Sequence, residues 1–540
     1  MSWPYSGTAR RPLVTGRQGL VSCAHSLAAA VGHEVLRSGG NAVDAAVAVS
    51  AALDVTEPFM SGLGGGGAML IRPRGGPTHS LHYGGMFPLA ATLENLNAAK
   101  TDKGPTALTV PGAPAGWAAA WRRFGTQPLD KLLGPAIQLA EHGFMLTPTG
   151  SSLMKMGFGR LVGQGRSTFA VNDAAPPPGH VIRQTDLAQT YRTLARDGLE
   201  TFYEGNIGAK LVEAVRDAGG LLTQEDLARP QVSWCEPSAC DVGGYHVQST
   251  GWPYTSYETL LALKILANAP EFESLDSADL WHYRIEATKL AMADRVNFGG
   301  ESAHLAEGLL SDAYAKSRFE LLKAGTALLG TGERYAASPL KGAVTPGSPK
   351  DFARECTTHF DLVDSDGMVV SVTQTLGSVF GSGFMAGSTG VLLNNLLFFF
   401  DLDPNSPMSI ELGEMRSGPL SPLLALSGEE VVLQIGTPGA FGIPQTTTQM
   451  TSNVLDLQMN VQAAVEAPRF RLYGGKKIGV ERRAGDAVVN ALKSRGHDVQ
   501  VLSGFSPVVG GGHGIFKDIE SGYYSGGADP RRDGYALGVN

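Results

Sequence analysis

Two threonine side chains stand at the ends of a predicted β-hairpin late in the sequence. The stretch from residue 354 to residue 376, RECTTHFDLVDSDGMVVSVTQTL, alternates polar and apolar residues around a Ser-Asp-Gly loop, whose glycine can adopt a positive φ. If Asp364 faces Met368 across that loop, Thr357 faces Thr375 with the two Cβ atoms roughly 5 Å apart. A β-bulge between the loop and this end of the hairpin would make the pairing less regular. The pair is either a catalytic nucleophile with a supporting hydroxyl or an ordinary cross-strand Thr–Thr pair without a catalytic role. Hairpin geometry alone favours the second interpretation.

A turn that could stabilise a negative charge follows a later predicted strand. The strand EVVLQIG, residues 430–436, continues into TPGAFG and then directly into a predicted helix. Backbone N–H groups at the start of a helix have no partner within it, so they favour an anion or a developing oxyanion. The sequence therefore contains a candidate nucleophile and a candidate oxyanion site.

The composition is that of an ordinary globular protein. The 540 residues are 43% hydrophobic and 17% charged with a formal net charge of −8, which is enough chain for a large core or several domains. No run of 18 apolar residues and no signal-peptide pattern occur, so we predict a cytoplasmic protein without a membrane partner. Lys and Arg form no basic stretch with interleaved aromatic residues, which argues against a nucleic-acid partner.

The cysteines predict neither a disulfide framework nor a metal centre. Cys23, Cys235, Cys240 and Cys356 form no CxxC pair in this long chain. We expect free thiols, with a Cys235–Cys240 bridge as the alternative, and we predict no metal and no cofactor.

The first part of the chain predicts two helices and a glycine-rich strand. Ser26 to Arg37 has helical composition, and Asn41 can cap a second helix that runs to about Leu53 and is apolar nearly all round, hence buried. SGLGGGGAMLIR, residues 61–72, is a glycine run entering a strand. A phosphate loop would end in Gly-Lys-Ser/Thr, so close backbone packing is the favoured interpretation.

Helices dominate the middle of the chain and strands dominate its end. Residues 116–324 show helical periods, and the pairs Asp294-Arg295 and Glu286-Lys289 suggest surface pairing on a helix. After Cys356 we expect strands in GVLLNNLLFFF, EVVLQIG, KIGVE, DVQVL and GIFKD, with a helix near residues 445–457. This order predicts an α/β layered fold whose sheets carry a helix layer on each side.

The segment CTTHFDLVDSDGMVVSVTQTLGSVFGSGFMAGSTGVLLNN resembles the start of the small subunit of γ-glutamyltransferases, which are N-terminal-nucleophile hydrolases. RSGGNAVDAAVAVSAAL, GLGGGGAMLIR, GTPGAFGI and GGADPRRDGYA resemble further family segments in the same order, so the resemblance covers nearly the whole chain. It implies a four-layer αββα sandwich. It also implies that the precursor cuts its own Cys356–Thr357 bond, giving a large subunit of residues 1–356 and a small subunit of residues 357–540 that stay together as a heterodimer.

The resemblance also implies roles for individual residues. Thr357 would be the nucleophile in both self-cleavage and acyl transfer, and its freed amine would be the general base. Thr375 would orient and polarise Thr357. The oxyanion donors would be the backbone N–H groups of Gly439 and Ala440, where the family usually has two glycines. His359 would be structural.

Several positions depart from the family pattern, and all of them concern the acyl donor. An arginine that grips the donor carboxylate is replaced by Gly84, and residues that hold the donor amino group are replaced by Gly377, Leu396 and Phe399. A serine pair is shortened to Ser417 and Gly418, whereas Asn395 is kept and is expected to shape the pocket wall. Because an unpartnered buried charge costs several kcal/mol, an ordinary γ-glutamyl head should bind badly.

Three functions remain in competition at this stage. The first is a self-processing amide hydrolase or acyltransferase with an oxamate-, cephalosporin-side-chain- or oxalyl-type donor, including carbon–carbon cleavage in secondary metabolism. The second is a true γ-glutamyltransferase or glutathione hydrolase with altered recognition. The third is an unprocessed, non-catalytic binding protein. Arg416, Arg469 and His513 could hold a donor carboxylate, although a structural role is favoured for each.

Overall fold

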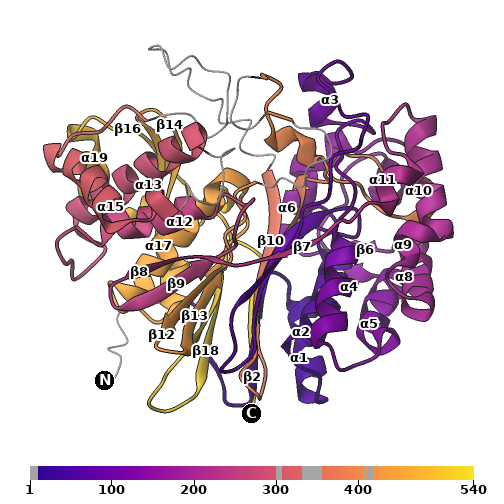
Figure 1. The fold of residues 1–540 in the computed structure, drawn as a ribbon, viewed down its shortest axis with the longest axis horizontal. Coiled ribbons are helices and arrows are strands. Elements are labelled where there is room, and N and C mark those ends of the chain that lie inside the picture. The colour runs from indigo at the N-terminus through magenta and orange to yellow at the C-terminus, as the bar shows by residue number, and fades with distance from the viewer. Residues whose placement is uncertain (1–9, 299–306, 331–354, 405–408, 411–417) are drawn as a thin grey trace.

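A computed structural model describes residues 10–298, 307–330, 355–404, 409–410 and 418–540. Two seven-stranded antiparallel sheets face each other at the centre, and helices cover the outer face of each sheet (Figure 1). The predicted four-layer αββα sandwich is therefore confirmed. No helix in the described ranges is both long and apolar enough to cross a membrane.

The first sheet contains the predicted hairpin at its centre. Its strands, in spatial order, are β19 (Tyr535–Val539), β2 (Gly19–Cys23), β10 (Glu355–Val363), β11 (Val369–Ser378), β3 (Gly66–Arg72), β4 (His79–Tyr83) and β7 (Ser233–Cys235). The strands of the second sheet, in order, are β1 (Val14–Gly16), β18 (Tyr524–Ala528), β17 (His513–Lys517), β13 (Glu430–Gly436), β12 (Leu423–Ser427), β9 (Tyr245–Ser249) and β8 (Ser238–Val242). Both sheets therefore mix strands from either side of the bond between Cys356 and Thr357.

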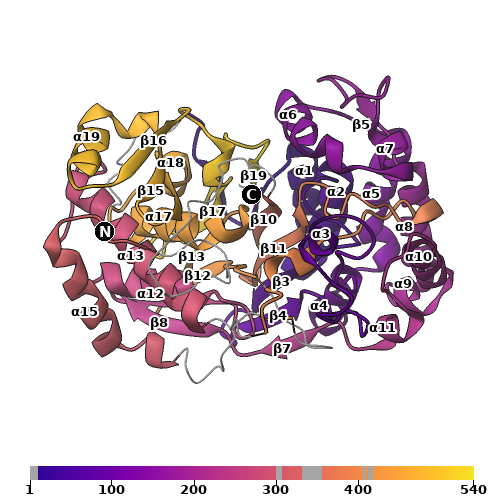
Figure 2. The same ribbon diagram turned by 90° about the horizontal axis from the view of Figure 1, so that it is seen from above.

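Each outer face has its own helix layer, and the two layers lie on opposite sides of the sheets when the molecule is seen from above (Figure 2). The layer on the first sheet contains α1 (Ser26–Arg37), α2 (Ala42–Thr56), α4 (Ala113–Phe124), α5 (Leu129–His142) and α8 (Thr185–Asp197). Around it lie α3 (Ala98–Asp102), α6 (Pro148–Gly157), α7 (Gly163–Phe169), α9 (Thr201–Glu204), α10 (Asn206–Asp217), α11 (Gln224–Ala228) and the short strands β5 (Phe144–Met145) and β6 (Val181–Ile182).

The layer on the second sheet also supports a small third sheet. Its helices are α12 (Tyr257–Leu266), α13 (Ala278–Phe298), α15 (Asp312–Glu320), α17 (Ile443–Leu455), α18 (Val461–Glu466) and α19 (Asp486–Ser494). The third sheet consists of β14 (Phe470–Gly474), β15 (Lys477–Glu481) and β16 (Asp498–Leu502). The predicted strands KIGVE, DVQVL and GIFKD correspond to β15, β16 and β17, so this part of the prediction is confirmed.

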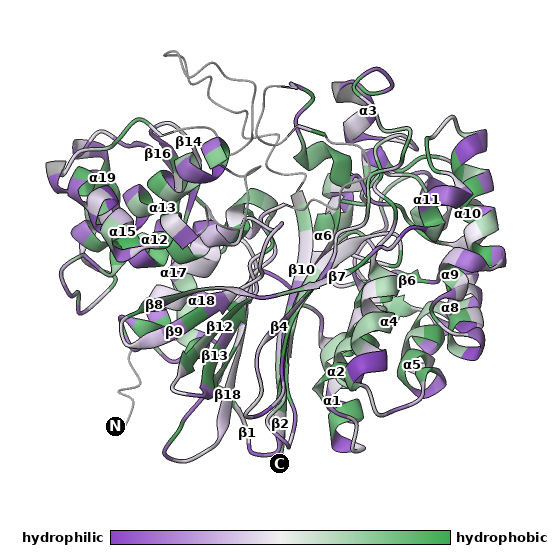
Figure 3. Ribbon diagram, in the orientation of Figure 1, coloured by the Kyte–Doolittle hydropathy of each residue, from purple (hydrophilic) through white to green (hydrophobic). Residues whose placement is uncertain are grey.

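Helix α1 has the predicted bounds, and α2 begins after Asn41 as predicted but runs to Thr56, beyond the predicted end near Leu53. Asn41 accepts hydrogen bonds from the N–H groups of Val43 and Asp44, and every residue of α2 is buried, as its all-round apolar sequence predicts. The hydrophobic residues gather along the central strands and on helices such as α2 that pack against them (Figure 3). The glycine run before β3 is explained by close packing, because a Cβ on Gly65 would lie 2.4 Å from the carbonyl oxygen of Thr375.

Two expectations about the middle of the chain are wrong. Glu286 and Lys289 form an ion pair on α13, but both side chains are buried, because α13 is covered by α12, α15, α17 and α19. Asp294 and Arg295 do not pair with each other on a surface; they bind Arg318 and Glu258 instead. The alternative Cys235–Cys240 bridge is also absent, since none of the cysteines forms a disulfide.

Candidate active site

Thr357 lies on β10 opposite a β-bulge in β11. Thr358 pairs with Gln374 and Cys356 pairs with Gly377, so two residues of β11, Thr375 and Leu376, oppose Thr357 alone. The predicted one-to-one register therefore holds from Val363 to Thr358, and the bulge that the sequence analysis gave as the alternative lies opposite Thr357. The predicted hydroxyl contact is nevertheless present, with the two Oγ1 atoms 3.3 Å apart. Bulges of this kind re-aim a side chain without ending the strand.

The carbonyl oxygen of Cys356 accepts hydrogen bonds from both threonine hydroxyls. Thr357 Oγ1 donates to it at 2.6 Å, and Thr375 Oγ1 also donates to it over a short distance. The backbone N–H of Gly377 donates to Thr375 Oγ1 at 2.8 Å and so fixes that hydroxyl. Both threonines are almost fully buried. Hydroxyl donors on a carbonyl oxygen draw electron density from the carbonyl carbon, which makes the peptide bond between Cys356 and Thr357 more open to attack.

A narrow pocket opens onto the two threonines. Its volume is about 20 Å³, little more than a water molecule requires. The residues that line it are Gly66, Gly67, Gly84, Thr357, Thr375, Leu396, Phe399, Gly418, Pro419, Leu420 and Ala440. The structure thus brings together Thr357, Thr375 and Ala440 with four of the predicted donor-contacting positions, namely Gly84, Leu396, Phe399 and Gly418.

A larger cavity of about 590 Å³ lies elsewhere, lined by residues that include Arg10, Leu457, Arg483 and Phe505. None of the hydroxyl groups described above reaches it. Chemistry rather than size therefore places the candidate site at the narrow pocket beside Thr357.

The wall of the narrow pocket is apolar at Leu396 and Phe399, two of the positions at which the sequence departs from the pattern that it resembles. Leu396 to Phe399 form a 3-10 turn rather than the strand that we expected, and the ring of Phe399 packs against that of Phe441 at 5.4 Å. The strand prediction fails because a side chain, rather than a neighbouring strand, forms a hydrogen bond with the backbone here. Asn394 Oδ1 accepts the N–H of Leu396 at 3.0 Å, in place of a partner strand.

Asn395 and Gly377 do not line the pocket. Asn395 Oδ1 accepts the N–H of Ser378 at 2.8 Å, and its Nδ2 donates to the carbonyl oxygen of Asp102 at 2.9 Å, so the side chain supports the wall from behind. Gly377 has a φ of +99°, and a Cβ there would lie 2.4 Å from Asn395 Oδ1. Glycine at position 377 therefore makes room for Asn395. Ser417, like Arg416, lies outside the described residues.

Arg469 and His513 contact other buried residues and do not line the pocket. Arg469 forms a fully buried ion pair with Asp529 at 2.7 Å. His513 stacks on His359 between the sheets, with ring centroids 6.4 Å apart, and neither histidine lines the pocket. His359 Nδ1 is 2.8 Å from Thr373 Oγ1, and its Nε2 is 3.1 Å from Asp361 Oδ2. These contacts agree with the structural role expected for His359.

The turn after β13 adopts a conformation that is unusual for alanine. Gly439 has a φ of +137° and precedes the 3-10 turn Ala440–Gly442, whose first residue, Ala440, has a φ of +44°; α17 follows this turn. Ala440 lines the pocket, and the backbone N–H groups of residues 439 and 440 donate to no other described residue. A left-handed conformation costs a residue with a Cβ roughly 1–2 kcal/mol, and strain of this kind is typical of functional sites.

Substitutions of Ala440 should separate backbone strain from donor function. We expect A440G to retain kcat/KM within about threefold, because glycine keeps the N–H and accepts the positive φ. A440V should reduce kcat/KM at least about tenfold, because a β-branched residue resists that φ. Steady-state kinetics with thermal unfolding as the control for folding would check both. Equal activity of A440V and the unaltered protein would contradict this account of the turn.

Glu57, which follows α2, is a buried acid that the sequence analysis missed. Its Oε2 accepts a hydrogen bond from Thr358 Oγ1 at 2.9 Å, one residue from Thr357. Burial raises the pKa of Glu57 from 4.5 to about 7, although the nearby Arg532 opposes this rise. In the sequence, Glu57 directly follows the mostly apolar helix α2, which itself contains the acids Asp44 and Asp54. Near neutral pH, Glu57 therefore gains or loses a charge behind the candidate nucleophile.

The free energy of unfolding should depend on pH because of Glu57. A carboxyl whose pKa is raised in the folded state stabilises that state fully below pH 4.5, and this contribution is lost as the pH rises through 7. We expect the free energy of unfolding of E57Q, relative to the unaltered protein, to increase by about 2–3 kcal/mol between pH 5 and pH 8. Urea unfolding at both values measures it, with E34Q on the exposed side of α1 as the control. A constant difference would contradict the raised pKa.

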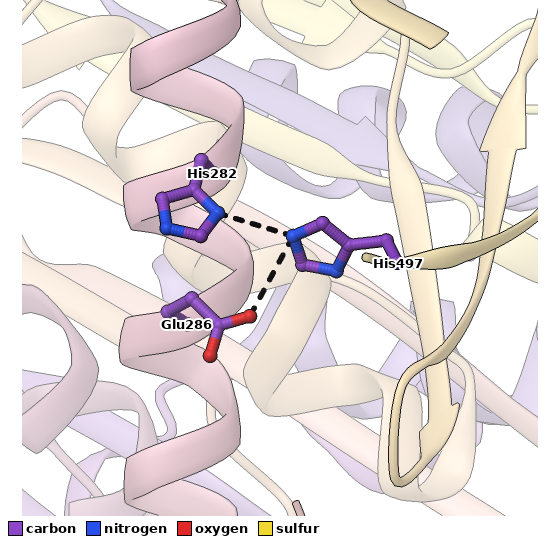
Figure 4. A group of neighbouring side chains, drawn as sticks. All are labelled: His282, Glu286 and His497. Carbon is purple, nitrogen blue, oxygen red and sulfur yellow. Dashed lines mark hydrogen bonds and ion pairs between the residues drawn. The ribbon is translucent and has the colours of Figure 1, made fainter. Parts of the chain in front are cut away.

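One buried group has the residue types of a metal site. His282 and Glu286 lie on α13, and His497 approaches them from the loop before β16 (Figure 4). His282 Nδ1 is 3.1 Å from His497 Nε2, which is 3.6 Å from Glu286 Oε1. Burial, with nearby cations, lowers the pKa of His282 to about 4 and that of His497 to about 3, so both rings are neutral near pH 7.

The carboxylate of this group already has a cationic partner. Lys289 Nζ lies 2.7 Å from the same Oε1 atom of Glu286, and both side chains are buried. A divalent ion would be forced next to that ammonium group, and repulsion at such a distance is strong in a buried site. We therefore assign no metal to His282, Glu286 and His497, and interpret them as a polar contact between α13 and the third sheet.

Comparison with known proteins relates almost the whole chain to one group. A sequence model described as Gamma-glutamyltranspeptidase matches residues 28–539. The chain is 32% identical to the Acylase ACY 1 proenzyme of Pseudomonas sp. (strain SE83), over 99% of this chain and 96% of the relative. It is 31% identical to the glutathione hydrolase proenzyme of Bacillus subtilis (strain 168), over 100% of this chain and 96% of the relative. The crystal structure of cephalosporin acylase from Bacillus halodurans matches with a TM-score of 0.87 and 32% identity, covering 100% of this chain and 99% of that one.

Proposed function

Because the chain belongs to the γ-glutamyltranspeptidase family, we propose that it is a self-processing amide hydrolase or acyltransferase with Thr357 as its nucleophile. The observation that carries this proposal is the double hydrogen bond from Thr357 and Thr375 to the carbonyl oxygen of Cys356, at the mouth of a pocket that also contains Ala440. The two curated relatives are both named proenzymes, which supports a precursor that is cut.

Self-processing would begin at the bond that the two hydroxyls surround. Thr357 Oγ attacks the carbonyl carbon of Cys356 and gives up its proton, the C–N bond breaks as the leaving nitrogen takes up a proton, and the chain before Thr357 becomes an ester on Oγ. Water hydrolyses this ester, which leaves a carboxylate on Cys356 and a free α-amine on Thr357. Residues 1–356 and 357–540 would remain together as a heterodimer, because each large sheet contains hydrogen-bonded strands from both.

Turnover would then reuse the same groups on an external acyl donor. The freed amine, whose ordinary pKa is near 8, takes the proton from Thr357 Oγ as Oγ attacks the donor carbonyl. The N–H groups of Gly439 and Ala440 stabilise the oxyanion, and the leaving amine departs with the proton. Water, or an amine acceptor in acyl transfer, releases the acyl group from Thr357. No metal or cofactor takes part in these steps.

The donor would not be an ordinary γ-glutamyl compound. Gly84, Leu396, Phe399 and Gly418 present no charged group to the pocket, and Phe399 belongs to an apolar cluster that includes Phe441. Oxamate-, cephalosporin-side-chain- and oxalyl-type donors are the candidates, including donors whose carbon–carbon bond is cleaved in secondary metabolism. A true γ-glutamyltransferase with altered recognition is the second candidate, favoured by the relative named glutathione hydrolase. The cytoplasmic location stays a prediction.

A denaturing gel followed by a donor panel tests this proposal against a binding protein. We expect two bands of about two-thirds and one-third of the chain, with the smaller starting at Thr-Thr-His-Phe. The processed protein should release ammonia from oxamate or amine from acyl p-nitroanilides. A single band that turns over no donor would instead support the unprocessed, non-catalytic binding protein.

A further inference from the structure

A buried arginine reaches the turn that contains Gly439 and Ala440. Arg471 lies on β14 with only 2% of its surface exposed. Its Nη1 donates to the carbonyl oxygen of Gly439 at 3.0 Å. The same oxygen accepts the backbone N–H of Gly442 at 2.8 Å. Two donors, one of them charged, therefore hold one end of the peptide group that joins Gly439 to Ala440.

The planarity of the peptide group carries this contact to the pocket. In a trans peptide the C=O and N–H bonds point in opposite directions, so the direction of the Gly439 carbonyl fixes that of the Ala440 N–H. A charged donor on the carbonyl also polarises the group, which strengthens its N–H as a donor. Ala440 lines the pocket beside Thr357. Arg471 thus orients the N–H without touching the pocket itself.

The chain makes room for this guanidinium. A Cβ on Gly442 would lie 1.3 Å from Arg471 Nη1 and 2.5 Å from Cζ, so no other residue fits at position 442 while Arg471 keeps its place. The φ of Gly442 is −82°, which any residue adopts. Glycine is therefore required here by the arginine and not by the backbone conformation.

Two glutamines set the position of Arg471 against α17. Gln445 Oε1 accepts the N–H of Leu472 at 2.8 Å, and Gln449 Oε1 accepts the N–H of Phe470 at 3.0 Å. Their Nε2 atoms donate to the carbonyl oxygens of the same two residues. β14 is an edge strand of its sheet, and the two glutamines of α17 take the place of a partner strand along its open edge. They bind the residues immediately before and after Arg471, namely Phe470 and Leu472.

We propose that Arg471 is a positioning residue for the oxyanion site, holding the strained Gly439–Ala440 peptide so that the Ala440 N–H faces the acyl carbonyl bound at Thr357. The proposal rests on the function proposed above, because an oxyanion forms only if Thr357 takes an acyl group. It adds a residue 32 positions from the turn, on a different sheet from Thr357.

Acylation by p-nitrophenyl acetate measures the effect. Thr357 Oγ bonds to the acetyl carbon, the ester C–O bond breaks, the Oγ proton passes to the Thr357 amine and p-nitrophenolate leaves as a coloured burst. We expect R471M to lower the acylation rate constant about 10- to 100-fold, with the dissociation constant of the ester unchanged within about twofold, because the oxyanion exists only after attack. R471K, which keeps a charged donor, should recover part of the rate.

G442A and R284M provide a second test and a matched control. G442A should reproduce the R471M defect, because its Cβ displaces the guanidinium. Arg284 is also buried and donates to Ser452 and Asn453 at the other end of α17, so R284M should keep the acylation rate within about twofold. If R471M does not fold, the acylation rates of G442A and R471K test the role of Arg471.

The possible failures are distinguishable. Processed R471M and G442A proteins that acylate at the unaltered rate would overturn the role of Arg471 and leave Thr357 as the nucleophile. A fall in rate that R284M shares would assign the effect to α17 stability and overturn the positioning role. An unaltered protein that is uncut or shows no burst would overturn the proposed function itself.

Discussion

Replacement of Thr357 by alanine is expected to leave one uncut chain of 540 residues that turns over no acyl donor. The alanine cannot attack the carbonyl of Cys356, so neither the ester nor the free amine forms. Since the same hydroxyl and amine then carry turnover, one substitution removes both. We expect kcat/KM to fall at least about 10⁴-fold, as for other enzymes that lose their nucleophile. A denaturing gel and the donor panel measure the two effects.

Two neighbouring substitutions make the T357A result specific. T357S keeps a hydroxyl and an N-terminal amine, so it should be cut and active at a reduced rate. T358V removes the adjacent hydroxyl, which binds Glu57 rather than the pocket, and should still be cut, with lower thermal stability. Cleavage of T357A at the same bond would contradict self-processing by Thr357.

Removing the charges of a γ-glutamyl donor is expected to improve it by about 10²- to 10³-fold in kcat/KM. Butyryl-p-nitroanilide has the γ-glutamyl chain without its ammonium and carboxylate groups, and glutaryl-p-nitroanilide lacks only the ammonium group. The described lining of the pocket offers these charges no partner, because its side chains are apolar apart from the two threonine hydroxyls. Burying a charge without a partner costs several kcal/mol, which corresponds to this ratio.

The rates with the butyryl, glutaryl and γ-glutamyl p-nitroanilides also distinguish the proposed function from a true γ-glutamyltransferase. Steady-state kinetics should rank butyryl above γ-glutamyl, with the place of glutaryl showing whether a carboxylate alone is accepted. F399A should enlarge the pocket and shift the preference toward longer acyl chains, while leaving Thr357 and Thr375 in place. A preference for γ-glutamyl over butyryl would contradict the apolar pocket and favour a true γ-glutamyltransferase.

The sequence predicted the local structure around the site well. The hairpin loop, the capped and buried α2 and the strands β15 to β17 all follow from short patterns that local geometry dictates. The bulge opposite Thr357 could not be predicted in the same way, because a single extra residue in β11 leaves the alternation of the strands almost unchanged. The 3-10 turn at Leu396 was missed because apolar residues also suit a strand, and the side chain of Asn394 decides between the two.

The prediction of the site was limited by contacts distant in sequence. The pocket joins Gly84, Thr357, Phe399 and Ala440, and the resemblance to a family supplied these positions where periodicity could not. Asn395 was expected to shape the pocket wall, but only the structure shows that it does so through hydrogen bonds to Ser378 and Asp102 and does not line the pocket. The contacts of Glu57 with Thr358 and of Arg471 with Gly439 depend on packing between separate elements, which no local pattern reveals.

Intact mass spectrometry of the purified protein, before and after brief exposure to p-nitrophenyl acetate, tests the central claim most directly. The account predicts two masses that correspond to residues 1–356 and 357–540, and a single acetyl adduct that fragmentation locates on Thr357. It also predicts that T357A shows one mass and no adduct. A full-length mass that never changes, or an acetyl group on another residue of the cut protein, would contradict the claim that Thr357 cuts the chain and then carries the acyl group.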